Sequence, residues 1–207
     1  MPDTDPATRA PVIRAHYSKL ALKRLRAYPE GKGAGVRERV SADNLAALRE
    51  ASSLDWLPAS AVIEVCDAIL AVLGEDAARE FWTDLMRDSY DHGLLKPLTM
   101  LAQFNVGLLG VSRLLRTAPE AWALSSQDCG SLEFLGDDTE DERSLQIRGV
   151  DLLPEILRSK GFVCVFYGAC RAMLEVFKSP GEIRVHEHEV VGAGRPQLAF
   201  EIAFDRR

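Results

Sequence analysis

The sequence predicts an α+β domain in which a helical layer packs on an antiparallel sheet built from two hairpins. Apolar residues recur at helical spacing along most of residues 12–115 and again along 154–177, whereas shorter stretches after residue 130 alternate between apolar and polar. Two hairpins and about six helices are typical of this class. A chain of 207 residues suits one hydrophobic core, so we expect a single domain over residues 12–207 behind a flexible N-terminus, residues 1–11.

Turn residues divide the first half of the chain into helices. Pro29 and the glycines of PEGKGAGVRER end the first helix, and we interpret that stretch as a connector. It lacks the spacing of a phosphate-binding loop and follows a helix instead of a strand. Gly74 is placed as a C-terminal cap, and Pro97 opens the most apolar helix. The expected helices span residues 12–28, 43–51, 58–73, 75–91 and 97–115.

In the second half of the chain, the spacing of apolar residues changes from helical to alternating. Alternation in SLEF and SLQI predicts a hairpin whose exposed link runs from Asp137 to Glu142. Pro154 then begins the helix around which the fold is organised, and Gly161 is a candidate break in it. The last hairpin joins EIRVHEHEVV to PQLAFEIAF through the turn at residues 192–195. Pairing Val191 with Pro196 would put the apolar side chains of both strands on one face.

Charge and cysteine content restrict the class of protein. The net charge of −6 argues against nucleic acid as a partner, although residues 1–40 carry nine Lys or Arg against four acids. That basic start would bind a phosphate or an acidic partner, or simply form a solvated helix face. The four cysteines lack paired spacing, as expected for core residues of a reduced cytoplasmic protein. No secretory signal and no membrane span are predicted.

The final hairpin presents the sharpest candidate site. The expected register puts His186 and His188 on the outer face, with Glu201 directly opposite His186. Two imidazoles and a carboxylate can supply three ligands to zinc and leave the fourth position to water. A polar face turned to solvent explains the same pattern, because the apolar residues of these strands already face inward.

A second candidate site lies on the organising helix. Cys164, Phe166, Tyr167 and Cys170 could line an apolar ligand pocket, although such a stripe at helical spacing is also typical of a core. His92, at the end of a helix, would either ligate haem iron or interact with the helix dipole. No G-x-S-x-G motif or triad spacing occurs, so we expect no enzyme activity and no cofactor.

The order of the expected helices and hairpins resembles that of a known protein family. The segments LRAYPEG, SSLDWLPAS, GVDLLPEILRSKGFVCVFYGACRAMLEVF and AFEIAF resemble a myxobacterial protein family of about this length. That family is distantly similar to the superfamily of haem nitric-oxide-binding domains, four-vinyl-reductase-type domains and TRAPP transport-particle subunits. The resemblance implies an antiparallel sheet covered by helices, a buried ligand or acyl pocket in several branches, and dimers in others.

The gas-sensing branch implies a more specific site that this sequence does not reproduce. In that branch a helix histidine holds the iron, and a Tyr-x-Ser-x-Arg stretch binds the haem propionates. Here only Ser112-Arg113 matches, and no histidine lies inside a long apolar helix. We therefore expect a non-enzymatic regulatory or sensor module that binds a small apolar ligand or a protein partner, with a homodimer left open. The alternatives are a haem- or metal-dependent sensor and a metal-dependent hydrolase.

Overall fold

The computed structural model describes residues 10–29, 31–92, 108–135, 144–189 and 196–203, and it confirms the α+β class. Helices and strands are segregated along the chain, as the change of hydrophobic period predicted. The helices are α1 (His16–Leu25), α2 (Lys32–Arg39), α3 (Ala42–Glu50), α4 (Ala59–Leu73), α5 (Glu75–His92), α7 (Leu108–Arg116), α8 (Ala118–Ser125), α9 (Pro154–Arg158) and α10 (Lys160–Val176). The strands are β1 (Val12–Arg14), β2 (Trp56–Pro58), β3 (Ser126–Gln127), β4 (Ser131–Leu135), β5 (Ser144–Val150), β6 (Glu182–Glu189) and β7 (Pro196–Ala203).

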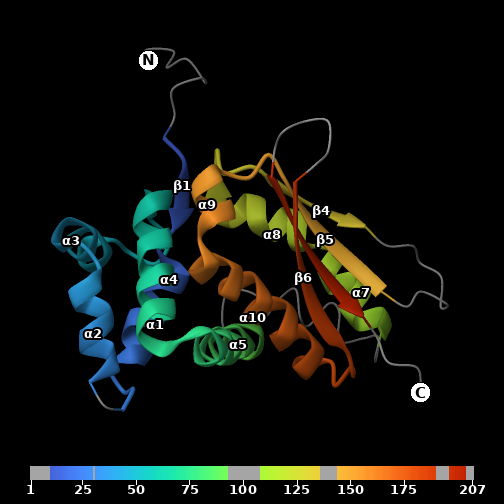
Figure 1. Ribbon diagram of the computed structural model, residues 1–207, viewed down its shortest axis with the longest axis horizontal. Coiled ribbons are helices and arrows are strands. Elements are labelled where there is room, and N and C mark those ends of the chain that lie inside the picture. The colour runs from blue at the N-terminus through green and yellow to red at the C-terminus, as the bar shows by residue number, and fades with distance from the viewer. Residues whose placement is uncertain (1–9, 30, 93–107, 136–143, 190–195, 204–207) are drawn as a thin grey trace.

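Helix α10 lies between a group of helices and the main sheet (Figure 1). It packs on α5 and α4 on one side and on β6 and β7 on the other. The main sheet is antiparallel in the order β4-β5-β7-β6, and a small sheet, β2-β1-β3, ties the start of the chain to the loops before α4 and after α8. Helix α10, the main part of the helix predicted to organise the fold, therefore lies at its centre.

Two glycines let α10 approach its neighbours at backbone distance. A Cβ atom on Gly161 would lie 2.4 Å from the carbonyl of Cys66 in α4, and one on Gly168 would lie 2.7 Å from backbone and Cβ atoms of Trp82 in α5. Real Cβ contacts are not that short, so only glycine permits these crossings. No space therefore remains between α10 and α4 at Gly161, or between α10 and α5 at Gly168.

The start of α10 is fixed by polar side chains. Ser159 Oγ accepts a hydrogen bond from Phe162 N (2.9 Å) and donates one to Asp67 Oδ1 of α4 (2.7 Å). Asp67 Oδ1 also accepts from Gly161 N (3.0 Å), so two of the free backbone donors of the first turn are satisfied. The predicted break in the organising helix is confirmed, but it falls at Ser159 and not at Gly161.

The final hairpin has the predicted faces in a different register. Pro196 pairs with Glu189 instead of Val191, so the connection is longer than expected and every pair shifts by two residues. An even shift leaves each side chain on its predicted face. The inner face is accordingly apolar, with Leu132, Phe134, Leu145, Ile147, Ile183, Val185, Phe200 and Ile202.

Two other expectations were wrong. The glycine-rich stretch is helix α2 and not a connector: Gly31 takes a left-handed conformation (φ 68°) at its N-cap, and Gly33 meets the carbonyl of Leu25. Residues 12–14 form β1 in place of the first turn of a helix. Helix α8, which has Pro119 in its first turn, was not predicted. Most of the predicted 97–115 helix lies outside the described residues, which include α7. Within the described residues, no helix is long and apolar enough to cross a membrane.

Candidate functional site

An aromatic cluster fills the space between α10 and the inner face of the sheet. The ring of Phe166 lies 5.3 Å from that of Phe200 in β7, 5.5 Å from Trp122 in α8 and 5.4 Å from Phe162, measured between centroids. Trp122 Nε1 donates to Gly130 O at 2.9 Å, so its polar atom is satisfied although the side chain is buried. Phe166, predicted to line a pocket, therefore packs in the core on its sheet side.

The other three predicted pocket residues face a different element. Cys164 lies beside Arg79 of α5, and the guanidinium of Arg79 stacks on the Tyr167 ring, 4.7 Å from its centroid. Cys170 neighbours Tyr90, whose hydroxyl donates to Ala169 O at 3.3 Å. Burial raises the pKa of the Cys170 thiol to about 12, so it is an uncharged core residue at neutral pH. The four residues are not gathered around one cavity, and the ligand pocket stays a prediction.

A surface depression of about 340 Å³ lies at the end of α10. Its lining includes Arg171, Glu175 and Lys178, together with Leu174 and the turn from Ser179 to Gly181. This lining is polar and partly charged, unlike that of the apolar pocket expected from the sequence.

The outer face of the sheet brings two of the three predicted metal ligands together. His186 Nε2 lies 2.9 Å from Glu201 Oε2, although Glu201 is diagonal to His186 and directly opposite Arg184. The predicted direct pairing was thus wrong, because the register differs by two residues. The hydrogen bond with His186 lowers the pKa of Glu201, with smaller contributions from Ser144 and Arg184, while burial opposes them.

The third predicted ligand, His188, pairs with Gln197 in the register, and its side chain lies outside the described part of the structure. The described side chains contain no group of three or more His, Cys, Asp or Glu residues that could hold a metal ion. The zinc site therefore stays a prediction that depends on His188.

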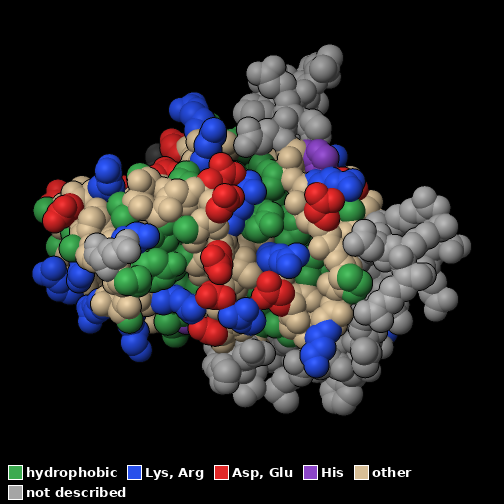
Figure 2. All heavy atoms as spheres, turned by 60° about the horizontal axis from the view of Figure 1, so that its bottom comes forward, with side chains coloured by type: hydrophobic (Ala, Val, Ile, Leu, Met, Phe, Trp, Pro, Cys, Tyr) green, Lys and Arg blue, Asp and Glu red, His purple; other side chains and the backbone are tan. Residues whose placement is uncertain are grey.

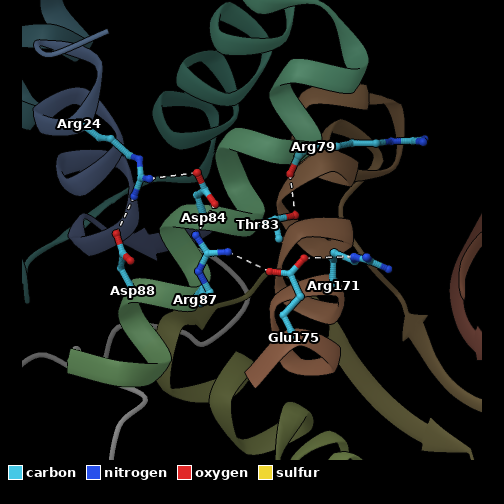
Figure 3. A network of polar contacts seen from close by, with 8 residues as sticks. All are labelled: Arg24, Arg79, Thr83, Asp84, Arg87, Asp88, Arg171 and Glu175. Atoms are coloured by element: carbon cyan, nitrogen blue, oxygen red, sulfur yellow. Dashed lines mark hydrogen bonds and ion pairs between the residues drawn. The ribbon is translucent and has the colours of Figure 1, made fainter. Parts of the chain in front are cut away.

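A chain of ion pairs crosses three helices on another face (Figure 3). Arg24 of α1 binds Asp88 (2.6 Å) and Asp84 (3.2 Å) of α5. Arg87 binds Asp84 (2.5 Å) and then Glu175 of α10 (3.0 Å), and Glu175 also binds Arg171. Figure 2 shows acidic and basic side chains alternating on this face, with apolar side chains between them. The network joins the N-terminal helices to α10 and was not predicted from the sequence.

No protein-family model matches the chain, and no curated protein sequence matches it. Solved structures do match. The unliganded Fe(II) H-NOX mutant A71G from K. algicida aligns with a TM-score of 0.61 at 11% identity, over 94% of this chain and 98% of that one. The chain has the fold of an H-NOX domain.

Two further structures support this fold. An oxygen-binding H-NOX domain related to soluble guanylate cyclases, solved as its oxygen complex, aligns with a TM-score of 0.57 at 12% identity, over 94% of this chain and 96% of that one. An H-NOX structure that addresses the mechanism of activation aligns with a TM-score of 0.53 at 14% identity, covering 94% and 97%. The predicted similarity to the haem nitric-oxide-binding superfamily is confirmed at the level of fold, whereas the myxobacterial resemblance stays a prediction.

The H-NOX fold raises the question of whether this chain can hold haem. A porphyrin needs an enclosed slot and an axial ligand. Among the described residues, the interface of α10 with the sheet is filled by the aromatic cluster, and its seams with α4 and α5 close at Gly161 and Gly168. The described residues therefore do not provide a slot for the porphyrin.

The histidines do not provide an evident iron ligand either. The sequence has four: His186 is on the outer face of the sheet, and the side chains of His92 and His188 lie outside the described residues. His16 is half-buried at the start of α1, edge-on to Tyr17 at 5.0 Å, and it does not line the depression at the end of α10. Burial lowers the pKa of His16, which favours its neutral form. The described residues thus do not fit a haem.

Proposed function

We propose that this chain is a non-enzymatic regulatory or sensor module that acts by binding a protein partner or a small apolar ligand. Its likeness to H-NOX domains extends over almost the whole of both chains. One of those domains is related to soluble guanylate cyclases, and another structure addresses H-NOX activation.

The packing of the interior supports one of the two kinds of binding over the other. Phe166 and its three aromatic neighbours occupy the space between α10 and the sheet, where a buried ligand would otherwise separate the two layers. Because side chains fill this space, binding of a partner at the surface is favoured over binding of a buried ligand. This is the observation that carries the proposal.

A haem-dependent sensor is the second candidate. The structural neighbours support it more specifically than they support a module for an apolar ligand, since they include an oxygen complex and a study of haem distortion. Four buried polar atoms on α1 and α5 also lack a hydrogen-bond partner within the described residues: His16 Nε2, Ser18 Oγ, Arg79 Nε and Trp82 Nε1. Buried polar groups normally have partners, so a ligand group or a water would be accommodated there.

The remaining expectations stay predictions. A metal-dependent hydrolase would require His188 to complete the ligand set of His186 and Glu201 beside a cleft. A homodimer, a cytoplasmic location and the exclusion of nucleic acid also await measurement.

Native mass spectrometry of the purified full chain, compared with its denatured mass, tests the main proposal. We expect the mass of the polypeptide alone, as a monomer or a dimer, because the described interior is full. A stoichiometric apolar molecule would support the ligand arm of the proposal over the partner arm. A stoichiometric haem would contradict the main proposal and establish the second candidate.

A further inference from the structure

The two N-terminal helices carry an excess of positive charge that the rest of the molecule does not share. Residues 10–40 hold eight Lys or Arg against two Glu, whereas residues 41–207 hold 16 against 27. Lys and Arg side chains gather at the end of the molecule that carries α2 and α3 in Figure 1, on the left in Figure 2. This distribution separates a basic end from an acidic body.

Only some of these cations are compensated. Arg24 binds Asp84 and Asp88, and Lys19 donates to the carbonyls of Leu48 and Ala51. Four others are exposed and have no carboxylate partner among the described residues; they form what we call the basic surface: Lys23, Arg26, Arg37 and Arg39.

Backbone packing places the two helices that carry the four cations against each other. A Cβ on Gly33 would lie 2.1 Å from Leu25 O, so α2 rests on the last turn of α1. Arg26 directly follows that carbonyl, and Arg37 Nε donates to Gly33 O at 3.1 Å on the other side of the contact. Lys and Arg in the last turn of a helix also stabilise that helix by interacting with its dipole. Glu38, between Arg37 and Arg39, is the one exposed carboxylate described on these two helices.

We infer that the basic surface docks an acidic protein segment that also presents apolar side chains. Charge complementarity provides the attraction, and Leu22 and Tyr28 are partly exposed beside the cations for apolar contact. A long nucleic acid or a membrane surface would extend past the basic end and meet the acidic body, which disfavours both. This inference rests on the proposed regulatory function and names the chemistry of its partner.

Binding of a fluorescein-labelled amphipathic peptide of Glu and Leu, followed by fluorescence anisotropy on the full chain, tests the inference. The test variant replaces Lys23, Arg26, Arg37 and Arg39 with Gln. The control variant replaces four exposed cations elsewhere with Gln, so that the change in net charge is equal: Arg113, Arg158, Lys160 and Lys178. Circular dichroism checks that both variants fold.

We expect wild type and the control variant to bind the peptide alike, and the test variant to bind about tenfold more weakly, with binding weakened by salt. Absence of binding by wild type, or equal loss in the two variants, would overturn the inference. Tighter binding of single-stranded DNA or of phosphatidylserine vesicles than of the peptide would overturn the choice of a protein segment. None of these outcomes depends on whether the chain holds a small ligand, so they are separable from the result of native mass spectrometry.

Discussion

Replacing Gly161 with Ala tests the packing of α10 directly. The added Cβ would lie 2.4 Å from the C and O atoms of Cys66 and 2.5 Å from Asp67 N. All three are backbone atoms, so α4 and α10 must move apart by about 1 Å to restore ordinary contact. Overpacking of this kind costs about 1–3 kcal/mol, while Ala gains about 0.5–1 kcal/mol over Gly in a helix. We expect a net loss of stability.

Gly35→Ala is a matched control, because Gly35 is also helical but its Cβ would meet only the Val72 methyl groups at 3.7 Å. Here the gain in helix propensity should dominate and stabilise the protein by up to about 1 kcal/mol. Urea unfolding at neutral pH gives both free energies of unfolding. If Gly161→Ala proved as stable as Gly35→Ala, the close crossing of α4 and α10 would be refuted.

Three further predictions concern other parts of the molecule. Phe166→Ala should lower the free energy of unfolding by about 3 kcal/mol, near the lower end for a core Phe because the residue is partly exposed; a negligible loss in urea unfolding would mean that the ring is not core. Because Glu201 has a lowered pKa in the folded state, its ionised form stabilises the protein above the ordinary Glu pKa, and that contribution is lost as pH falls through the folded pKa. The stability gap between wild type and Glu201→Gln, measured by thermal unfolding across acidic pH, should therefore shrink with acidification, and a gap that widens would contradict the assignment. Glu175→Gln should cost at most about 1 kcal/mol, and less at high salt, because the network in Figure 3 is only partly buried; a cost independent of salt would argue against an electrostatic role.

Elements bounded by strong local signals were predictable from the sequence. Helix α4 lies between Pro58 and Gly74, as expected, because Gly74 adopts the positive φ that a C-terminal glycine cap permits. The faces of the final hairpin were also predictable, because alternation fixes them in any even register. The register itself was not, since it depends on the length of the connection.

Features that depend on tertiary contact could not be predicted. The glycines of α2 indicated a connector, yet Gly33 is needed where α2 rests on Leu25. The contacts between helices in the ion-pair network join residues 60 to 88 positions apart, so no local spacing reveals them. The contact of His186 with Glu201 was predicted, but through direct pairing and not across a diagonal.

Titration of the purified apoprotein with hemin, followed by its absorption spectrum, tests the central claim that the described residues of this fold fill its interior. The packing around Phe166, Gly161 and Gly168 predicts no saturable change of the Soret band at one equivalent. A sharp Soret band that saturates at one haem per chain would contradict the account, and its loss in His16→Ala would identify the ligand.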